Sequence, residues 1–230
     1  MPARAGAAPA VAMSLPEMGG RRASYRERIG EALRAAVITG ELAPGKVYSV
    51  PVLAEQFGVS ATPVREAMLD LVKEELVEPV PNKGFRVKVV SEAQLDEYTK
   101  LRELIEIPTT VALATTADPA DIEALRPLAQ AIVDAAAEED LIAYVEADMR
   151  FHLEMLALSG NATLVETVRN LRQRSRLYGL TALMELGELE ESAGEHLEIL
   201  HGLLTRDPEY VRQVMELHLS HVRGSWAQPT

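Results

Sequence analysis

The fold is decided by the stretch Phe57-Gly58-Val59-Ser60-Ala61-Thr62-Pro63-Val64-Arg65-Glu66-Ala67-Met68. Gly58 can adopt the left-handed backbone that ends a helix, and Ser60 is a favourable N-cap for the next helix. Pro63 falls in the first turn of that second helix, where a missing backbone donor has little effect. The stretch therefore predicts a helix, a tight turn and a second helix.

The second helix of this pair divides into an apolar and a polar face. Its apolar residues recur at the spacing of one helical stripe: Val64, Ala67, Met68, Leu71 and Val72. Thr62, Arg65 and Leu69 point elsewhere, so a hydroxyl and a guanidinium lie away from the core. A helix-turn-helix motif needs this division, because its exposed N-terminal end enters the major groove of DNA.

The flanking sequence predicts a winged helix-turn-helix domain over residues 21–90. Helices are expected over 21–39, 51–57 and 60–75, and β-rich segments over 77–80 and 85–90. The turn Pro81-Asn82-Lys83-Gly84 between these segments indicates a hairpin with a basic tip. The first helix opens with four arginines, which suit either a solvated helix end or phosphate contacts: Arg21, Arg22, Arg26 and Arg28.

Residues 91–230 carry long helical patterns and predict an all-α bundle of six or seven helices. The expected helices cover 92–117, 119–137, 140–158, 162–183, 192–205 and 207–222. Pro127 and Gly179 are possible interruptions, and Ser192-Ala193-Gly194-Glu195 matches a capping box at a helix start. The whole chain is therefore mainly α, with residues 1–20 as a disordered tail.

The net charge of −12 is divided unevenly along the chain. Residues 21–90 hold 11 Lys and Arg against 9 Asp and Glu, whereas residues 91–230 hold 11 against 25. Local positive charge is what phosphate binding requires, so global acidity does not exclude a DNA-binding domain. The chain has no cysteine and no apolar run near the ~20 residues that span a bilayer, so we expect a cytoplasmic protein that contacts no membrane.

The acidic half holds all five histidines: His152, His196, His201, His218 and His221. Asp148 and His152 are four positions apart and share one helix face. Three imidazoles from different helices and this carboxylate would suit Zn²⁺, Ni²⁺, Fe²⁺ or Mn²⁺, with coordination positions open. Buried, hydrogen-bonded histidines are the alternative explanation. His201 is expected at the surface, and His221 could only support a ligand indirectly.

Arginines in this half allow two interpretations. Arg102 could clamp the carboxylate of an effector through paired donors, or it could form an ion pair with Glu103 or Glu106. A cluster in a later helix fits interleaved ion pairs better than nucleic-acid contacts: Arg169, Arg172, Arg174 and Arg176. The acidic run from Glu185 to Glu191 is expected to be a solvated loop.

The chain resembles the GntR family of bacterial transcription regulators, in its FadR-like branch with an FCD-type effector-binding helical domain. In the first half the resemblance rests on Gly40-Glu41-Leu42-Ala43-Pro44-Gly45, Leu53-Ala54, Gly58-Val59-Ser60, Thr62-Pro63-Val64-Arg65-Glu66-Ala67 and Pro81-Asn82-Lys83-Gly84. In the second half it rests on Arg102, Glu106, Asp148, Phe151-His152, Gly160-Asn161, Glu195-His196 and His218-Leu219.

The resemblance implies a homodimer that binds a palindromic double-stranded DNA operator, with a small organic acid changing its DNA affinity. The DNA contacts that it implies are Thr62, Arg65, Lys83 and Gly84; Ser60 at the start of the recognition helix and Arg26 at the start of the first helix are further candidates from the sequence itself. The implied metal ligands, with zinc the first expectation, are Asp148, His152, His196 and His218, and Arg102 would hold the effector. Many relatives have arginine where this chain has Pro51 and Ala61, so Arg65 must carry more of the base readout.

The sequence thus predicts a ligand-responsive transcription regulator rather than an enzyme. One alternative is a metal-dependent enzyme in the helical domain, but no acid–base partner is evident, since Glu154 and Glu195 point to other faces than the histidines beside them. A second alternative is a regulator whose metal is purely structural.

Overall fold

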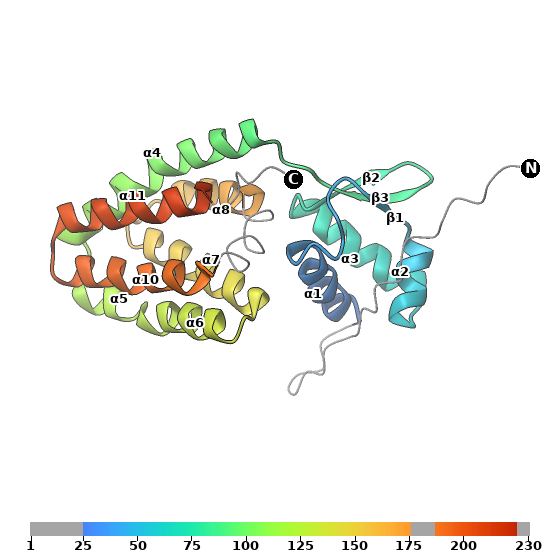
Figure 1. The fold of residues 1–230 in the computed structure, drawn as a ribbon, viewed down its shortest axis with the longest axis horizontal. Helices are drawn as coiled ribbons and strands as arrows, with labels where there is room; N and C mark the ends of the chain where they lie inside the picture. The colour runs from blue at the N-terminus through green and yellow to red at the C-terminus, as the bar shows by residue number, and fades with distance from the viewer. Residues whose placement is uncertain (1–24, 176–186, 225–230) are drawn as a thin grey trace, which may run out of the picture. The chain divides into compact units, whose positions relative to one another are not determined.

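The computed structural model describes residues 25–175 and 187–224, and the chain divides into two compact units between Lys88 and Val89 (Figure 1). Several predicted features lie outside the described residues: the tail over 1–20, Arg21, Arg22, Arg176, the possible break at Gly179 and the side chain of His221. Within the described ranges, no helix combines the length and apolarity that crossing a bilayer requires.

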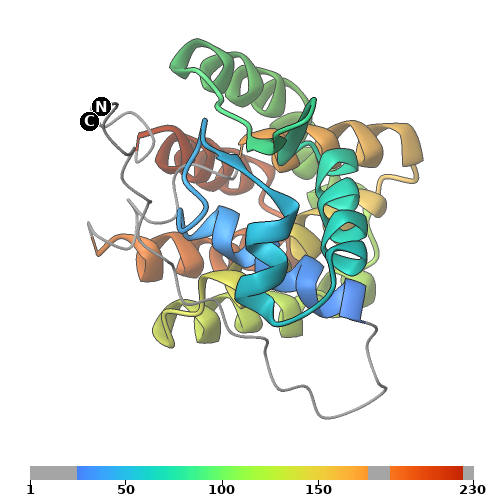
Figure 2. The ribbon, with the colours of Figure 1, turned by 90° about the vertical axis from the view of Figure 1, so that its right-hand side faces the viewer.

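The first unit is a winged helix-turn-helix. Its elements are α1 (Tyr25–Ile38), β1 (Val47–Tyr48), α2 (Val50–Phe57), α3 (Ala61–Lys73), β2 (Val77–Val80) and β3 (Gly84–Val87). Helix α3 packs against both α1 and α2 (Figures 1 and 2). The core is formed by side chains at most 7% exposed: Ile29, Leu33, Leu53, Phe57, Val64, Met68 and Leu71. Hydrophobic burial of these aliphatic stripes fixes α3, the expected recognition helix, on its supports.

The turn between α2 and α3 follows the sequence prediction in its backbone. Gly58 caps α2 with φ +64°, in the left-handed region where a side chain is unfavourable. Ser60 is the N-cap residue of α3, yet its hydroxyl makes no capping hydrogen bond. Its side chain is exposed, so the hydroxyl is available to a ligand at the start of the recognition helix.

The wing is a three-stranded antiparallel sheet in the order β1-β3-β2, whereas the sequence predicted two strands. The extra strand, β1, has two residues and gives no alternating pattern. It pairs Tyr48 with Phe85, which brings its backbone against Gly84. Gly84 has φ +131°, and an added Cβ would lie 2.1 Å from the Tyr48 carbonyl oxygen. Glycine at the wing is therefore required by the close approach of β1.

The second unit is an all-α bundle. Its described helices number seven: α4 (Glu92–Thr116), α5 (Pro119–Glu123), α6 (Arg126–Ala137), α7 (Leu141–Ala157), α8 (Ala162–Ser175), α10 (Leu189–Leu204) and α11 (Pro208–Gly224). The interruption considered at Pro127 is present, because α5 ends at Glu123 and α6 begins at Arg126 with Pro127 in its first turn. Helix α4 packs along α11 and α8 (Figure 1).

Three local predictions are wrong. Helix α10 begins at Leu189, with Glu188 as its N-cap residue, so Ser192 does not cap it and the segment 189–191 is not a loop. Leu189 is 4% exposed, and its burial favours the earlier start. Tyr25 was expected in the apolar stripe of the first helix, but its side chain is 62% exposed at the start of α1.

Candidate metal centre and DNA-binding surface

Four potential metal ligands converge inside the second unit. Asp148 and His152 lie one turn apart on α7, while His196 comes from α10 and His218 from α11. All four residues are buried, at most 2% exposed, and their candidate ligand atoms lie within 4.8 Å of one another. The structure thus brings together all four residues that the resemblance implied as ligands.

The distances among these atoms suit a transition-metal ion. His152 Nε2 lies 3.1 Å from His196 Nε2, and His196 Nε2 lies 3.1 Å from Asp148 Oδ1. His152 Nε2 is 3.7 Å from the same carboxylate oxygen. Two ligands bonded to zinc at ~2.0–2.2 Å are ~3.0–3.5 Å apart, so these residues are spaced to share one ion.

Hydrogen bonds at Nδ1 orient two of the imidazoles. His196 Nδ1 lies 3.0 Å from the Ala193 carbonyl oxygen, and His218 Nδ1 lies 2.8 Å from Glu195 Oε2. A proton held at Nδ1 leaves the lone pair on Nε2, the nitrogen that would bind a metal. The sequence did not predict this role of Glu195, because the spacing of residues within one helix does not show which side chains contact a residue on another helix such as α11.

His152 is held neutral by its surroundings. Burial lowers the pKa of this imidazole well below its usual value, and the neighbouring Arg172, His196, His218 and Arg102 lower it further. A neutral imidazole keeps the lone pair that coordination requires. The donor set of three imidazoles and one carboxylate, with its ligand atoms within 4.8 Å of one another, therefore fits a divalent transition metal.

A buried network of alternating charges adjoins the ligands. Arg102 Nε donates to Glu106 Oε1 at 2.6 Å, and Arg172 donates to Glu106 Oε2 from Nε at 3.1 Å and Nη2 at 2.6 Å. Arg172 Nη1 also donates to Asp148 Oδ2 at 3.2 Å. These four side chains are at most 3% exposed. Arg172 thus connects the carboxylate of a candidate metal ligand to Glu106 on helix α4.

The location of Arg172 corrects the interpretation of the α8 arginines. Arg172 does form ion pairs, but it is fully buried beside the candidate metal ligands instead of belonging to an interleaved surface set. Arg169 fits the surface interpretation, since it is 43% exposed and pairs with Glu166. The two arginines are three residues apart, and the sequence pattern does not distinguish them.

Charges within the network shift the pKa values of its members. Burial alone would raise the pKa of Glu106, but Arg102 and Arg172 outweigh it and hold that pKa at about 2. Burial lowers the pKa of Arg102 to about 10, and the nearby charge of Arg172 adds to this effect. Both groups are therefore charged at neutral pH.

Of the two interpretations that the sequence left open for Arg102, the ion pair with Glu106 is present in the structure. Arg102 is paired with Glu106 through Nε, whereas Glu103 pairs with Lys100. Its Nη1 is buried and has no hydrogen-bond partner within the described part of the chain. A guanidinium nitrogen in this situation is a ready donor for an anionic ligand.

The residues implied as DNA contacts lie at the start of α3 and at the wing. Ser60, Thr62 and Arg65 are exposed on the recognition helix, and Lys83 is exposed in the turn before β3. Arg26 differs from them: its Nε and Nη2 donate to the two carboxylate oxygens of Asp70 on α3, at 2.6 and 2.7 Å. This ion pair holds α1 against the recognition helix and occupies donors that a phosphate would need.

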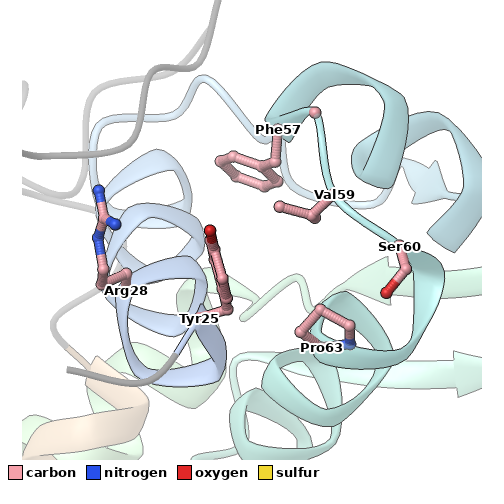
Figure 3. A pocket seen from close by; sticks show the side chains of 7 residues that line it. Tyr25, Arg28, Phe57, Val59, Ser60 and Pro63 are labelled. Carbon is pink, nitrogen blue, oxygen red and sulfur yellow. The ribbon is translucent and has the colours of Figure 1, made fainter. Parts of the chain in front are cut away.

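A hollow of about 440 Å³ opens beside the start of α3 (Figure 3). Tyr25 from α1 stands opposite Phe57, Val59 and Pro63 across it, and Arg28 from α1 also contributes to its lining. Gly58 and Ser60 complete its lining. The hollow leaves the Ser60 hydroxyl uncovered, as a contact with a DNA backbone at this helix end would require.

A winged helix-turn-helix followed by a helical domain defines a class of protein, the transcription regulators that bind DNA through the winged helix-turn-helix. Residues 25–87 match the model of the bacterial regulatory proteins of the gntR family, and residues 97–221 match that of the FCD domain. The chain belongs to the GntR family and carries an FCD domain.

Individual relatives agree with this assignment. The chain is 33% identical over 193 residues to a helix-turn-helix transcriptional regulator from an unstable DNA locus of Streptomyces ambofaciens, covering 83% of this chain and 80% of the relative. It is 27% identical over 197 residues to the transcriptional regulator McbR of Escherichia coli K12, covering 85% and 89%.

Solved structures share the fold. The structure of E. coli McbR/YncC matches with a TM-score of 0.65 at 28% identity, over 86% of this chain and 94% of that chain. A putative GntR regulator from Rhodococcus sp. RHA1 matches with a TM-score of 0.65 at 23% identity, over 89% and 99%. The enzymatic alternative is not supported, because the matching families and these relatives are transcription regulators. FCD domains are known to bind metals, and the buried Asp/His cluster could hold one.

Proposed function

We propose that this protein is a ligand-responsive regulator that binds a palindromic operator as a homodimer, with a small organic acid bound at its metal site changing DNA affinity. Two copies match the two halves of a palindrome. Helix α4 supplies apolar surface that a second copy could cover, since Leu101 and Leu104 are 45% and 61% exposed on it.

The DNA part of the proposal is supported by the exposed donors of the first unit. Arg65 on α3 can donate twice to one guanine, while Lys83 at the wing can only neutralise phosphate. Replacing Arg65 with alanine should therefore reduce the preference for operator over unrelated DNA by about fivefold to 150-fold, the equivalent of ~1–3 kcal/mol. Replacing Lys83 with alanine should weaken binding to all DNA alike and lower the salt slope by about 1.

Competition gel shifts with the DNA that flanks the protein's own gene measure both effects. An unchanged operator preference in the Arg65→Ala variant would assign base readout to another residue. Failure of the unaltered protein to bind any palindrome in that DNA would refute the proposal itself.

The effector part of the proposal is carried by one observation: Arg102 Nη1 is buried, charged and without a partner in the described residues, within the network that contacts the metal ligands. Asp148, His152, His196 and His218 would hold the metal. A bound divalent ion would act as a Lewis acid for an anionic ligand. Arg102 would orient a carboxylate by donating from Nη1, and Glu106 would keep that guanidinium in place.

An effector changes DNA affinity only by its different affinity for two states of the protein. Helix α4 is the first element of the second unit and begins three residues after Val89, so the helix that would contact the effector is also the helix joined to the DNA-binding unit.

Thermal shift on the metal-loaded protein tests the effector. A carboxylate that binds should raise the melting temperature, because a ligand at 100 times its Kd stabilises the folded state by ~2.7 kcal/mol. An Arg102→Met variant should lose this response and keep its metal. If no acid in a broad panel stabilises the protein while chelation lowers its melting temperature, the metal is structural and the effector proposal is wrong.

A further inference from the structure

Helix α4 holds two buried threonine hydroxyls without a hydrogen-bond partner in the described structure, Thr99 Oγ1 and Thr110 Oγ1. Thr99 is 4% exposed and Thr110 is fully buried. A hydroxyl that leaves water without gaining a hydrogen bond destabilises the folded protein. Such a group indicates that a ligand or a water molecule completes it.

Other helical threonines of this protein show how such a hydroxyl is ordinarily satisfied. Each donates to a backbone carbonyl three or four residues earlier, at 2.6 to 3.1 Å: Thr109, Thr115, Thr116 and Thr167. This local bond is the usual one for threonine in a helix. Thr99 and Thr110 do not make it, although both lie within α4.

The two hydroxyls lie on the same face of α4 as the buried ion pair. Thr99, Arg102, Glu106 and Thr110 are spaced by three, four and four residues, so they form one polar line directed into the bundle. Thr99 is ~4.5 Å of helix rise from Arg102, whereas Thr110 is ~12 Å away. Glu106 lies between Arg102 and Thr110 along the helix. A small acid bound at Arg102 Nη1 can therefore reach Thr99 and not Thr110.

We infer that the effector is a hydroxy acid, whose carboxylate is bound by Arg102 and whose hydroxyl is hydrogen-bonded by the Thr99 side chain. This inference rests on the proposed function. A threonine hydroxyl can donate and accept, so it pairs with the hydroxyl of a ligand. An acid without that hydroxyl leaves the buried Thr99 oxygen unpaired, and sites of this kind discriminate against such analogues.

Matched pairs of acids that differ by one hydroxyl test the inference: propanoate and lactate, succinate and malate, 3-phenylpropanoate and 3-phenyllactate. Affinities are measured by calorimetry on the full-length metal-loaded protein. In any pair of which both members bind, the hydroxy acid should bind about tenfold more tightly. A Thr99→Val variant, which removes the hydroxyl at nearly constant volume, should abolish this preference and still bind the plain acid.

Thr110→Val is the matched control, because it removes an equally buried hydroxyl from the same face beyond Glu106. It should leave the tenfold preference intact. Both valine variants should melt at or above the temperature of the unaltered protein, since each removes a buried hydroxyl that lacks a partner in the described structure. Melting therefore shows that an altered preference does not arise from misfolding.

The outcomes separate this inference from the proposed function. Equal binding of plain and hydroxy acids would overturn the inference but would not affect the proposal that the regulator responds to an organic acid. Loss of the preference in Thr110→Val instead of Thr99→Val would overturn the assignment of Thr99. If no acid of a wider carboxylate panel binds, both the inference and the effector part of the proposed function are wrong.

Discussion

Replacing His196 with alanine is expected to abolish stoichiometric metal binding. His196 Nε2 lies 3.1 Å from both His152 Nε2 and Asp148 Oδ1, so this candidate ligand contacts two of the others directly. Its removal leaves two imidazoles and one carboxylate. Altering a residue that merely orients a ligand already weakens metal binding about 10–100-fold, and loss of a ligand should exceed that range. Metal analysis of dialysed protein measures the effect.

His201→Ala provides the control for this variant. His201 lies on the same helix α10, five residues after His196, but its side chain is exposed and its ring packs against Tyr210. The control should retain one metal per chain and the melting temperature of the unaltered protein. The His196 variant should melt at the temperature of chelated protein, because stabilisation by a bound ion disappears with the ion. Stoichiometric metal in purified His196→Ala protein would refute the ligand assignment.

The first unit could be predicted from local sequence because its signals are local. Gly58 ends one predicted helix and Pro63 lies in the first turn of the next, and the apolar residues of both repeat at helical spacing. The observed helices α2 and α3 agree with this prediction. Strand β1 escaped prediction because two residues cannot display an alternating pattern, and its pairing with β3 is a contact across the fold. The sequence indicated Gly84 only as part of a turn, and it did not show that the backbone of Tyr48 lies against this glycine.

The candidate metal centre was predictable to a different degree for each ligand. Asp148 and His152 share one helix face by their spacing alone. His196 and His218 lie on two further helices, and periodicity cannot tell which faces of separate helices meet; the family resemblance supplied them. Glu195 shows the limit of a local motif: it fitted a capping box with Ser192, whereas burial of Leu189 starts the helix earlier and Glu195 contacts His218.

Replacing Arg172 with lysine is the second change from which we expect a large effect. The guanidinium of Arg172 reaches two carboxylates at once, Glu106 on α4 and Asp148 on α7. A lysine ammonium keeps the charge but is one compact centre, so it cannot reproduce both contacts from the same backbone position. Breaking a buried ion pair destabilises a protein by about 3–5 kcal/mol, and a disoriented Asp148 should weaken metal binding about 10–100-fold.

Two opposing effects of Arg172 decide the outcome of this experiment. The positive charge of Arg172 lies near the histidines and disfavours a bound cation, so removal of this charge would strengthen metal binding. The hydrogen bond from Arg172 to Asp148 Oδ2 orients a candidate ligand, so loss of this bond would weaken metal binding. The charge of Arg172 is already offset by Glu106 at 2.6 Å, and orientation should therefore dominate. Arg172→Lys and Arg172→Gln both lose the guanidinium that orients Asp148, whereas only Arg172→Gln also loses the positive charge. If orientation dominates, both variants should bind metal weakly.

Arg169→Lys is the matched control, since Arg169 lies one turn earlier on α8 and is 43% exposed in a pair with Glu166. It should change the free energy of unfolding by less than ~0.5 kcal/mol and leave metal affinity unaltered. Chelator competition measures affinity, urea unfolding of metal-free protein measures stability, and the visible spectrum of the cobalt-loaded protein reports the ligand field. Full affinity and an unchanged cobalt spectrum in Arg172→Lys would show that Arg172 acts through its charge alone, because orientation of Asp148 is the property that lysine cannot restore.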